Sequence, residues 1–302
     1  MELSNFFEFF KNLTLLILAV VALIAFLLYM FQNKILYIPV VTGLPKSPSE
    51  NPKPYRNPTD FGLEYENVYI KTSDNLKLHG WFIKQIKNSE SAPTILYYHE
   101  NAGNIGTRLY FLNAYYQNGY NVMLIAYRGY SDSEGIPSES GLYLDAQAIL
   151  DHLFNRNDID VSKIFIHGRS LGGAMAIYSA SETKFQPRGL ILENTFTSIS
   201  DMVDVIFPKL SFLKAPLIRN HFKSVERIGK IKVPILFIFA MKDQLVPPKQ
   251  MAKLFESAVN AQFKRKHIIE DGDHNSSWAL DVDTYFENIN KFTNEVLKQA
   301  QE

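Results

Sequence analysis

The most apolar part of the chain is residues 13–31, nineteen consecutive positions without a charge. As a helix rising about 1.5 Å per residue, this segment spans roughly 28 Å, about the hydrocarbon thickness of a bilayer. A cleaved signal peptide would be shorter and would carry a small-residue cleavage site, which is missing before Lys34. A core helix would show a polar face, and this segment has none. We therefore expect a membrane anchor over residues 1–34, with the transmembrane helix at about 13–31.

The segment after the anchor, residues 35–61, is rich in proline and polar side chains. Its six prolines cannot take part in regular helices or central strands, and proline-rich chains favour an extended backbone. We expect a stiff extended linker that holds the following domain away from the membrane.

From residue 62 to residue 302 the pattern becomes that of a globular domain. Two strand-like segments flank a turn at residues 72–75 and predict an antiparallel hairpin, and six short apolar runs then alternate with helical segments. The expected strands are 65–71, 76–83, 94–98, 121–126, 163–166, 189–192, 234–239 and 266–269, and the expected helices lie near 106–118, 139–154, 172–181, 248–258 and 281–299. Repeated strand–helix units with apolar strands predict an α/β domain with an eight-stranded, mostly parallel sheet covered by helices on both faces.

Residues 196–232 interrupt this alternation with apolar clusters and two prolines. We interpret them as a small helical lid inserted over the sheet, and a long connecting loop with one helix is the alternative. Either structure would border the active site, because it leaves the carboxyl end of a central strand.

Composition excludes several kinds of chemistry. The formal net charge is zero, which gives no indication of a nucleic-acid partner. The chain has no cysteine, which excludes disulfides, a thiol nucleophile and cysteine-based metal sites.

A candidate nucleophile lies directly after the apolar run at 163–166. Gly168 and Gly172 flank Ser170 at two positions on either side, and small helix-forming residues follow. This is the pattern of a nucleophile elbow, a turn between strand and helix so sharp that the serine backbone is strained. Side chains at the two glycine positions would collide with the neighbouring strand and helix.

A serine nucleophile needs a base and an orienting carboxylate. Asp243 follows the strand at 234–239 and His274 follows the next strand, so that all three groups lie just past a strand in the chain order Ser, Asp, His. Asp271 and Asp273 are closer to the histidine and are expected to form its turn. The other six histidines are expected to be structural: His79, His99, His152, His167, His221 and His267.

Acyl transfer also needs hydrogen-bond donors for the developing oxyanion. One donor is expected to be the backbone N–H of Leu171, the residue after the nucleophile. The second is expected from the loop at residues 99–104, and we assign it to the backbone N–H of Asn101.

These motifs together resemble the α/β-hydrolases, and in particular their single-pass membrane branch: member thirteen of the animal series and its fungal bud-emergence relatives. The motifs are Asn101-Ala102-Gly103-Asn104-Ile105-Gly106, Ala126-Tyr127-Arg128-Gly129-Tyr130-Ser131, Ser133-Glu134-Gly135, Gly168-Arg169-Ser170-Leu171-Gly172-Gly173-Ala174, Glu193-Asn194-Thr195-Phe196, Asp243-Gln244-Leu245-Val246-Pro247-Pro248 and Asp271-Gly272-Asp273-His274-Asn275. The resemblance implies an α/β-hydrolase fold with a small helical lid and an N-terminal transmembrane helix.

One position departs from the resemblance. Relatives usually carry glycine where this chain has Glu100, and a carboxylate beside an oxyanion site could oppose the developing negative charge. We take Glu100 and Phe196 as candidates for lining the substrate pocket.

The resemblance and the anchor together suggest a membrane serine hydrolase acting on acyl esters or thioesters, either lipids or S-acylated proteins. This chemistry implies no cofactor and no metal. The alternative is a catalytically weak or inactive hydrolase-fold subunit with a structural role in a membrane protein assembly, where other proteins of that assembly would be its partners.

The sequence is compatible with either side of the membrane and with the endoplasmic reticulum, another endomembrane or mitochondria. Three lysines follow the anchor within residues 34–53 and one precedes it, a small bias toward a cytosolic domain. Asn275-Ser276-Ser277 is a formal glycosylation sequon beside His274, so either the domain is outside the secretory lumen or the sequon is buried.

Overall fold

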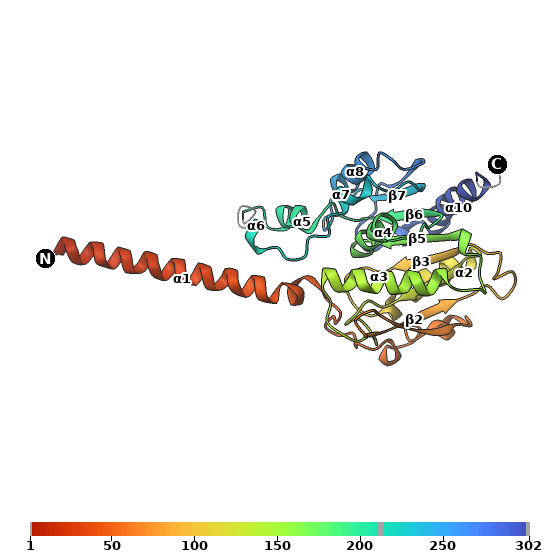
Figure 1. Ribbon diagram of the computed structural model, residues 1–302, viewed down its shortest axis with the longest axis horizontal. Helices are drawn as coiled ribbons and strands as arrows, with labels where there is room; N and C mark the ends of the chain where they lie inside the picture. The colour runs from red at the N-terminus through yellow and green to blue at the C-terminus, as the bar shows by residue number, and fades with distance from the viewer. Residues whose placement is uncertain (1, 210–213, 300–302) are drawn as a thin grey trace.

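The computed structural model describes residues 2–209 and 214–299, which form an eight-stranded sheet with helices on both faces (Figure 1). The strands lie in the order β1-β2-β4-β3-β5-β6-β7-β8. Their bounds are β1 Glu66–Lys71, β2 Lys77–Ile83, β3 Thr94–Tyr98, β4 Asn121–Ile125, β5 Ile164–Arg169, β6 Gly189–Glu193, β7 Ile235–Ala240 and β8 Lys264–Ile269. Pairing is antiparallel from β1 to β2 and from β2 to β4, and parallel across the rest of the sheet. The predicted fold class, with its hairpin and mostly parallel sheet, is confirmed.

The helices divide between the two faces of the sheet. Their bounds are α2 Leu109–Gln117, α3 Glu139–Phe154, α4 Leu171–Glu182, α8 Pro248–Ser257, α9 Ser277–Leu280 and α10 Val282–Lys298. Alternate side chains of a strand point to opposite faces. In β5, Phe165 packs against Phe292 of α10, whereas Gly168 lies against α4. The central strands are buried along their whole length, as expected for a sheet covered on both sides.

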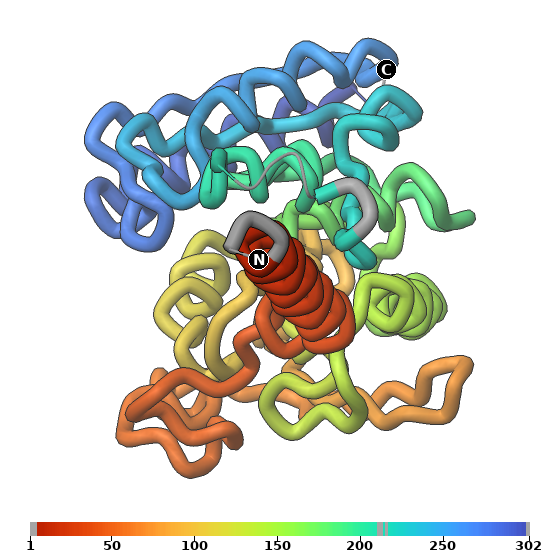
Figure 2. Tube along the Cα trace, turned by 90° about the vertical axis from the view of Figure 1, so that its left-hand side faces the viewer, coloured from red at the N-terminus to blue at the C-terminus, as the bar shows by residue number. Residues whose placement is uncertain are grey.

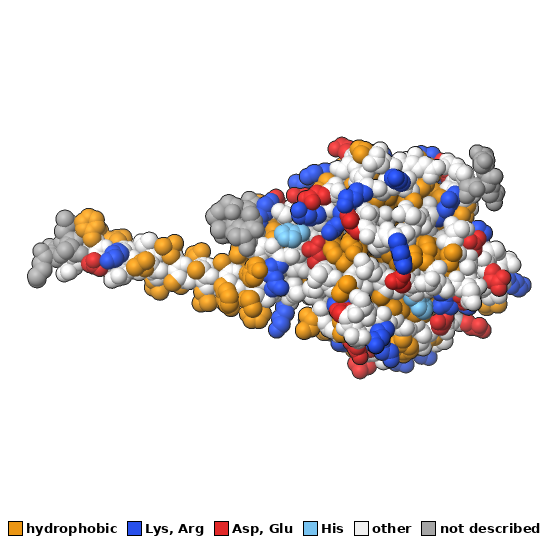
Figure 3. All heavy atoms as spheres, in the orientation of Figure 1, with side chains coloured by type: hydrophobic (Ala, Val, Ile, Leu, Met, Phe, Trp, Pro, Cys, Tyr) orange, Lys and Arg blue, Asp and Glu red, His pale blue; other side chains and the backbone are white. Residues whose placement is uncertain are grey.

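Helix α1 covers Glu2–Leu36 and is longer than the apolar segment that predicted it. It extends away from the domain in Figure 1, and its apolar side chains lie exposed along its length in Figure 3. Residues Asn5–Leu36 are long and apolar enough to cross a membrane. An exposed apolar helix of this length is what a bilayer would cover, and a core helix would be buried.

The proline-rich segment differs from the expected extended linker, because it folds onto the domain. Two short 3-10 helices, η1 Pro48–Glu50 and η2 Pro58–Phe61, start at prolines, whose fixed φ suits a first helical position. The fully buried Asn51 and the buried Asn104 exchange side-chain hydrogen bonds of 2.9 and 2.8 Å. This proline-containing segment packs on the surface of the domain instead of extending away from it. The end of α1 at Leu36 therefore lies directly against the domain.

The insertion after β6 contains three short helices, α5 Ile199–Ile206, α6 Lys214–Leu217 and α7 Ser224–Ile228. Residues 210–213 of the predicted lid lie outside the described residues, as do residue 1 and residues 300–302. The segment beyond α6 runs beside the end of α1, where the Gln32 side chain binds the backbone of residues 217, 219 and 220 (Figure 2). The insertion therefore contains helices, as expected, and Gln32 near the C-terminal end of α1 attaches to it; its role as a lid stays a prediction.

Candidate active site

Ser170 lies in the turn between β5 and α4, where its backbone takes φ 53° and ψ −121°. A non-glycine residue in such a conformation costs on the order of 1–3 kcal/mol, which the surrounding hydrogen bonds must offset. Ser170 N–H donates to Glu193 O at 3.0 Å, and its carbonyl accepts from Thr195 Oγ1 at 2.7 Å. A Cβ at Gly168 would lie 2.1 Å from Gly172 O, so the turn excludes a side chain there. The local geometry is that of the predicted elbow.

The structure brings Ser170, His274 and Asp243 into one hydrogen-bonded chain. His274 Nε2 lies 3.0 Å from Ser170 Oγ, and its Nδ1 lies 2.7 Å from Asp243 Oδ2. The serine and the histidine are each 8 % exposed, so the group is shielded but reachable. A base within hydrogen-bond reach of a hydroxyl, itself oriented by a carboxylate, is the arrangement that activates a serine.

Neighbouring groups fix the acid and the base. Asp243 Oδ1 accepts the backbone N–H groups of Leu245 and Val246 at 2.9 and 2.8 Å, which leaves Oδ2 for the histidine. Arg169 Nη2 donates to His274 O at 2.6 Å and holds the histidine loop against the elbow. Sequence reasoning missed this role of Arg169, although its place before the nucleophile was a usable signal.

The two rival carboxylates form the turn that carries the histidine. Asp273 accepts the N–H groups of Asn275 and Ser276, and Asp271 pairs with the exposed Lys242. Asp273 therefore forms the turn as expected, the Asp271 carboxylate pairs at the surface, and neither side chain bonds the imidazole.

The two assigned oxyanion donors lie beside the serine. Leu171 begins α4, so its N–H points out of the first helical turn without a helical acceptor. Asn101 belongs to the loop after β3 and lines the same cavity as Ser170. Among the described residues we find no acceptor for the backbone N–H of either residue. The N–H of Leu171 follows the serine directly and Asn101 lines the cavity, so their assignment as oxyanion donors stays a prediction.

Glu100 lines the cavity that contains Ser170, as expected, and its carboxylate is engaged in ion pairs there. Its carboxylate lies 2.6 Å from Arg108 Nε and 2.9 Å from Arg169 Nη1, and it accepts from Tyr97 Oη at 3.0 Å. Burial alone would raise the pKa of Glu100, but Arg108 and Arg169 hold that pKa well below its usual range. Its negative charge is therefore matched locally and does not stand alone beside the oxyanion site.

The cavity above Ser170 has a volume of about 410 Å³. Aromatic and apolar side chains make up part of its wall, and the guanidinium groups of Arg108 and Arg169 are turned toward carboxylates and carbonyls. Its lining includes Ile38, Tyr97, Phe111, Leu245, His274, Asn275 and Trp278. Phe196, expected in this lining, is absent from it, because its side chain is buried and packs edge-on against Phe222.

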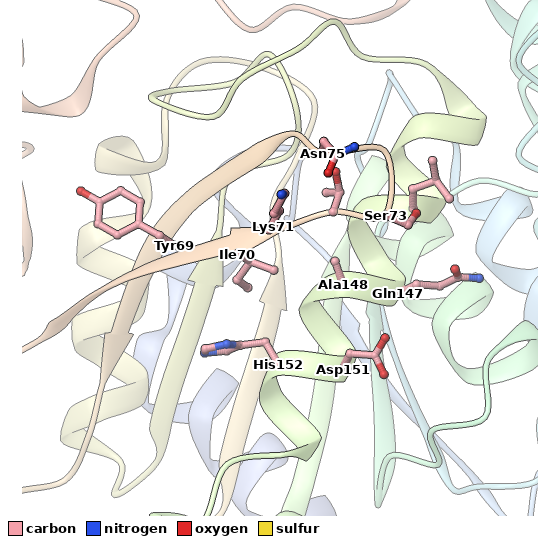
Figure 4. A pocket seen from close by; sticks show the side chains of 11 residues that line it. Tyr69, Ile70, Lys71, Ser73, Asn75, Gln147, Ala148, Asp151 and His152 are labelled. Atoms are coloured by element: carbon pink, nitrogen blue, oxygen red, sulfur yellow. The ribbon is translucent and has the colours of Figure 1, made fainter.

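A larger hollow of about 600 Å³ lies elsewhere, between the β1–β2 turn and α3 (Figure 4). Asp151 and His152 stand at its lower side in this view, with Tyr69 across from them. Ser73 and His152 both line it, but no hydrogen bond joins them, so its size alone does not make it the candidate active site.

No cluster of three or more potential metal-binding side chains occurs among residues 2–209 and 214–299. The carboxylates near Ser170 are held by arginines, backbone amides or the histidine. We therefore identify no group of described residues in the site that would hold a metal ion or an organic cofactor.

A mostly parallel sheet with a serine at its central strand–helix elbow defines the class of the α/β-hydrolases. A family model described as serine aminopeptidase, S33, matches residues 90–226. The α/β hydrolase domain-containing protein WAV2 of Arabidopsis thaliana is 39% identical over 274 residues, covering 86% of each chain. Protein bem46 of Schizosaccharomyces pombe is 36% identical over 291 residues, covering 96% of this chain and 94% of its own. The chain belongs to the α/β-hydrolase family, in the branch that contains these two proteins.

Solved structures agree with this fold. The Pyrococcus furiosus esterase Pf2001 superposes with a TM-score of 0.66 at 20% identity, covering 79% of this chain and 95% of the esterase. At this level of identity the likeness concerns the fold alone. A Saccharomyces cerevisiae relative named as an uncharacterized membrane protein is 36% identical over 270 residues, covering 88% of this chain and 89% of its own, which fits the exposed apolar helix α1.

Proposed function

We propose that this protein is a membrane-anchored serine hydrolase that cleaves acyl esters or thioesters. The observation that carries the proposal is the hydrogen-bonded chain from Ser170 through His274 to Asp243, at 3.0 and 2.7 Å. The chemistry that this geometry supports is acyl transfer to the serine followed by hydrolysis.

In the first half of the reaction, Ser170 Oγ attacks the acyl carbonyl while His274 Nε2 takes the hydroxyl proton. The tetrahedral oxyanion accepts hydrogen bonds from the N–H groups of Leu171 and Asn101. Collapse of this intermediate breaks the bond to the alcohol or thiol, which receives the proton from His274. Water then repeats the sequence on the acyl-serine and releases the carboxylic acid, with Asp243 orienting the imidazole throughout.

The position of the cavity favours substrates held at a membrane. Its wall includes Ile38, only two residues after the end of α1 at Leu36. The aromatic and apolar part of the wall suits an acyl chain, and the Glu100 carboxylate there is paired with Arg108 and Arg169. An acyl lipid or an S-acylated protein is therefore the proposed substrate class.

The glycosylation sequon at Asn275-Ser276-Ser277 helps to infer on which side of the membrane the domain lies. Asn275 is exposed and lines the cavity, so a glycan there would cover its mouth. The alternative of a buried sequon does not apply to this residue. Together with the lysines after the anchor, this supports a catalytic domain on the cytosolic side.

The decisive experiment is labelling of the full-length protein in detergent with a fluorophosphonate probe, which reacts with activated serines. We expect labelling of the wild type and none of Ser170→Ala, and a panel of acyl esters, thioesters and amides of graded length would then rank substrates. Absence of labelling in folded wild-type protein would overturn the proposal and favour the structural-subunit alternative.

A further inference from the structure

The first residues after the membrane helix are bound to the loop that carries Asn101. Gly103 N–H donates to Ile38 O at 3.0 Å, and Ile38 forms a parallel β-bridge with Ala102. Asn101 Nδ2 donates to Leu36 O, the last residue of α1, at 2.6 Å. Three successive residues of the loop are thus tied to the end of the anchor.

The carboxamide of Asn101 is held at both of its polar atoms. Its Oδ1 accepts from Tyr130 Oη at 2.7 Å, so the side chain bridges the anchor end and the loop after β4. Arg108 Nη2 also donates to Ala102 O at 2.6 Å. Because the loop is fixed from three directions, the direction of its backbone N–H groups is fixed as well.

We infer that residues 36–38 are part of the active site, where they hold the second oxyanion donor in place, and that the Asn101 side chain is the positioning residue. This inference rests on the proposed function, since the donor matters only if an oxyanion forms. Ile38 meanwhile lines the cavity itself beside Ser170. The anchor would therefore serve catalysis as well as attachment, because the chain leaving the membrane sets the geometry of the site.

Removing the carboxamide should affect the reaction more than substrate binding. Loss of a whole oxyanion donor lowers kcat by about 10²–10³-fold. Asn101→Ala keeps the backbone N–H of residue 101 but removes the side-chain bonds that fix its direction. We therefore expect kcat to fall by about tenfold with little change in KM. Tyr130→Phe removes only the second bond to the carboxamide and should have a smaller effect.

The experiment measures kcat and KM of the full-length protein in detergent on a short acyl ester. The matched control is Asn260→Ala, which removes an amide-to-carbonyl bond of the same 2.6 Å length, to Gly229, on an exposed loop. We expect the control to retain wild-type kcat. Tyr130→Phe should cause no further loss in the Asn101→Ala background, because both changes act through one carboxamide.

Hydrogen exchange at residues 99–104 provides a readout that does not need activity. Asn101→Ala should speed exchange there, and Asn260→Ala should not. Unchanged exchange, or a kcat within twofold of the wild type, would overturn the inference. If wild-type protein hydrolyses nothing and fails to label at Ser170, the proposed function fails, while the exchange result still decides whether the anchor holds the loop.

Discussion

Arg169 contacts three parts of the candidate site that lie far apart in sequence. Its guanidinium donates to His274 O at 2.6 Å, pairs with Glu100 at 2.9 Å and lies 3.7 Å from Glu193 Oε1. Burial disfavours its charge, but Glu193 and Glu100 raise the pKa of this arginine overall. The Arg169 side chain thus connects the turn at Ser170 to the loop of His274 and to the loop of Glu100. The charge of this arginine is balanced by the carboxylates of Glu100 and Glu193.

Glu100→Gly removes both the carboxylate and the Cβ, and it tests this balance. If the carboxylate opposed the oxyanion, its removal would raise kcat. We expect kcat to fall and the free energy of unfolding to drop by about 2–4 kcal/mol, because two largely buried arginines lose their partner. Urea unfolding and ester kinetics measure both quantities.

Two further variants separate charge from backbone flexibility. Glu100→Gln keeps the Cβ and should behave like the glycine variant. Glu295→Gln removes one partner of the exposed pair with Arg265 and should change stability by at most about 1 kcal/mol. A rise in kcat for Glu100→Gln would show that the carboxylate hinders the reaction.

His99 gives the fold a dependence on pH. Burial first, and then Arg108, lowers the pKa of this histidine to about 4. Its ring fits best as a neutral group, since Nδ1 lies 2.7 Å from Glu100 O while Nε2 accepts from Tyr127 N–H at 3.3 Å. The unfolded chain binds the proton near pH 6.5, so stability present above that pH is lost as the pH falls toward 4.

Linkage then predicts the size of this loss. Between pH 7.5 and 5, His99 should cost about 2 kcal/mol of unfolding free energy. Urea unfolding of the wild type and of His99→Gln at both pH values isolates this contribution from that of the other histidines, because glutamine keeps one donor and one acceptor without titrating. Equal losses in the two proteins would mean that His99 is not the group responsible.

At the scale of elements, the positions of strands and helices could be predicted from the repeat of apolar residues. The conformation of irregular segments that pack on the domain could not be predicted in this way. Apolar runs and their flanking turns located the ends of each strand to within three residues, because burial of a parallel sheet leaves a continuous apolar signature. The segment at 35–61 has no period, and its contacts are made by single side chains such as Asn51 with residues distant in sequence. The proline content of this segment predicted an extended chain, but its contacts with the rest of the domain determine its folded conformation.

The joint between α1 and the insertion leads to a prediction at this scale. The Gln32 carboxamide donates to Leu217 O at 2.8 Å and accepts from the N–H groups of Arg219 and Asn220 at 2.8 and 2.9 Å. Gln32→Ala should therefore speed hydrogen exchange at residues 218–222 by roughly tenfold, the equivalent of one to two net hydrogen bonds. Gln117→Ala, on an exposed face of α2, is the control. Unchanged exchange in the Gln32 variant would mean that α1 does not hold the insertion.

At the scale of the whole molecule, the three candidate catalytic side chains meet because parallel strands share a carboxyl edge. Ser170, Asp243 and His274 each follow a strand in the expected order, and that alone predicted their proximity. The pairing of Glu100 could not be predicted, since its partners Arg108 and Arg169 reach it only through the folded loops. The catalytic role of the three side chains stays a prediction for the labelling experiment.

The same edge of the sheet faces the end of α1, so the molecule should act on its own bilayer. If residues 13–31 span the hydrocarbon, the cavity wall at Ile38 lies within roughly 14 Å of it, five helical and two extended residues away. Reconstituted protein should then hydrolyse an acyl ester embedded in the same vesicles far faster than one in separate vesicles, by about tenfold or more from effective concentration alone. A soluble short-chain ester should be cleaved at equal rates in both mixtures, which controls for enzyme content. Equal rates on the two embedded substrates would mean that the cavity opens away from the membrane that holds the protein.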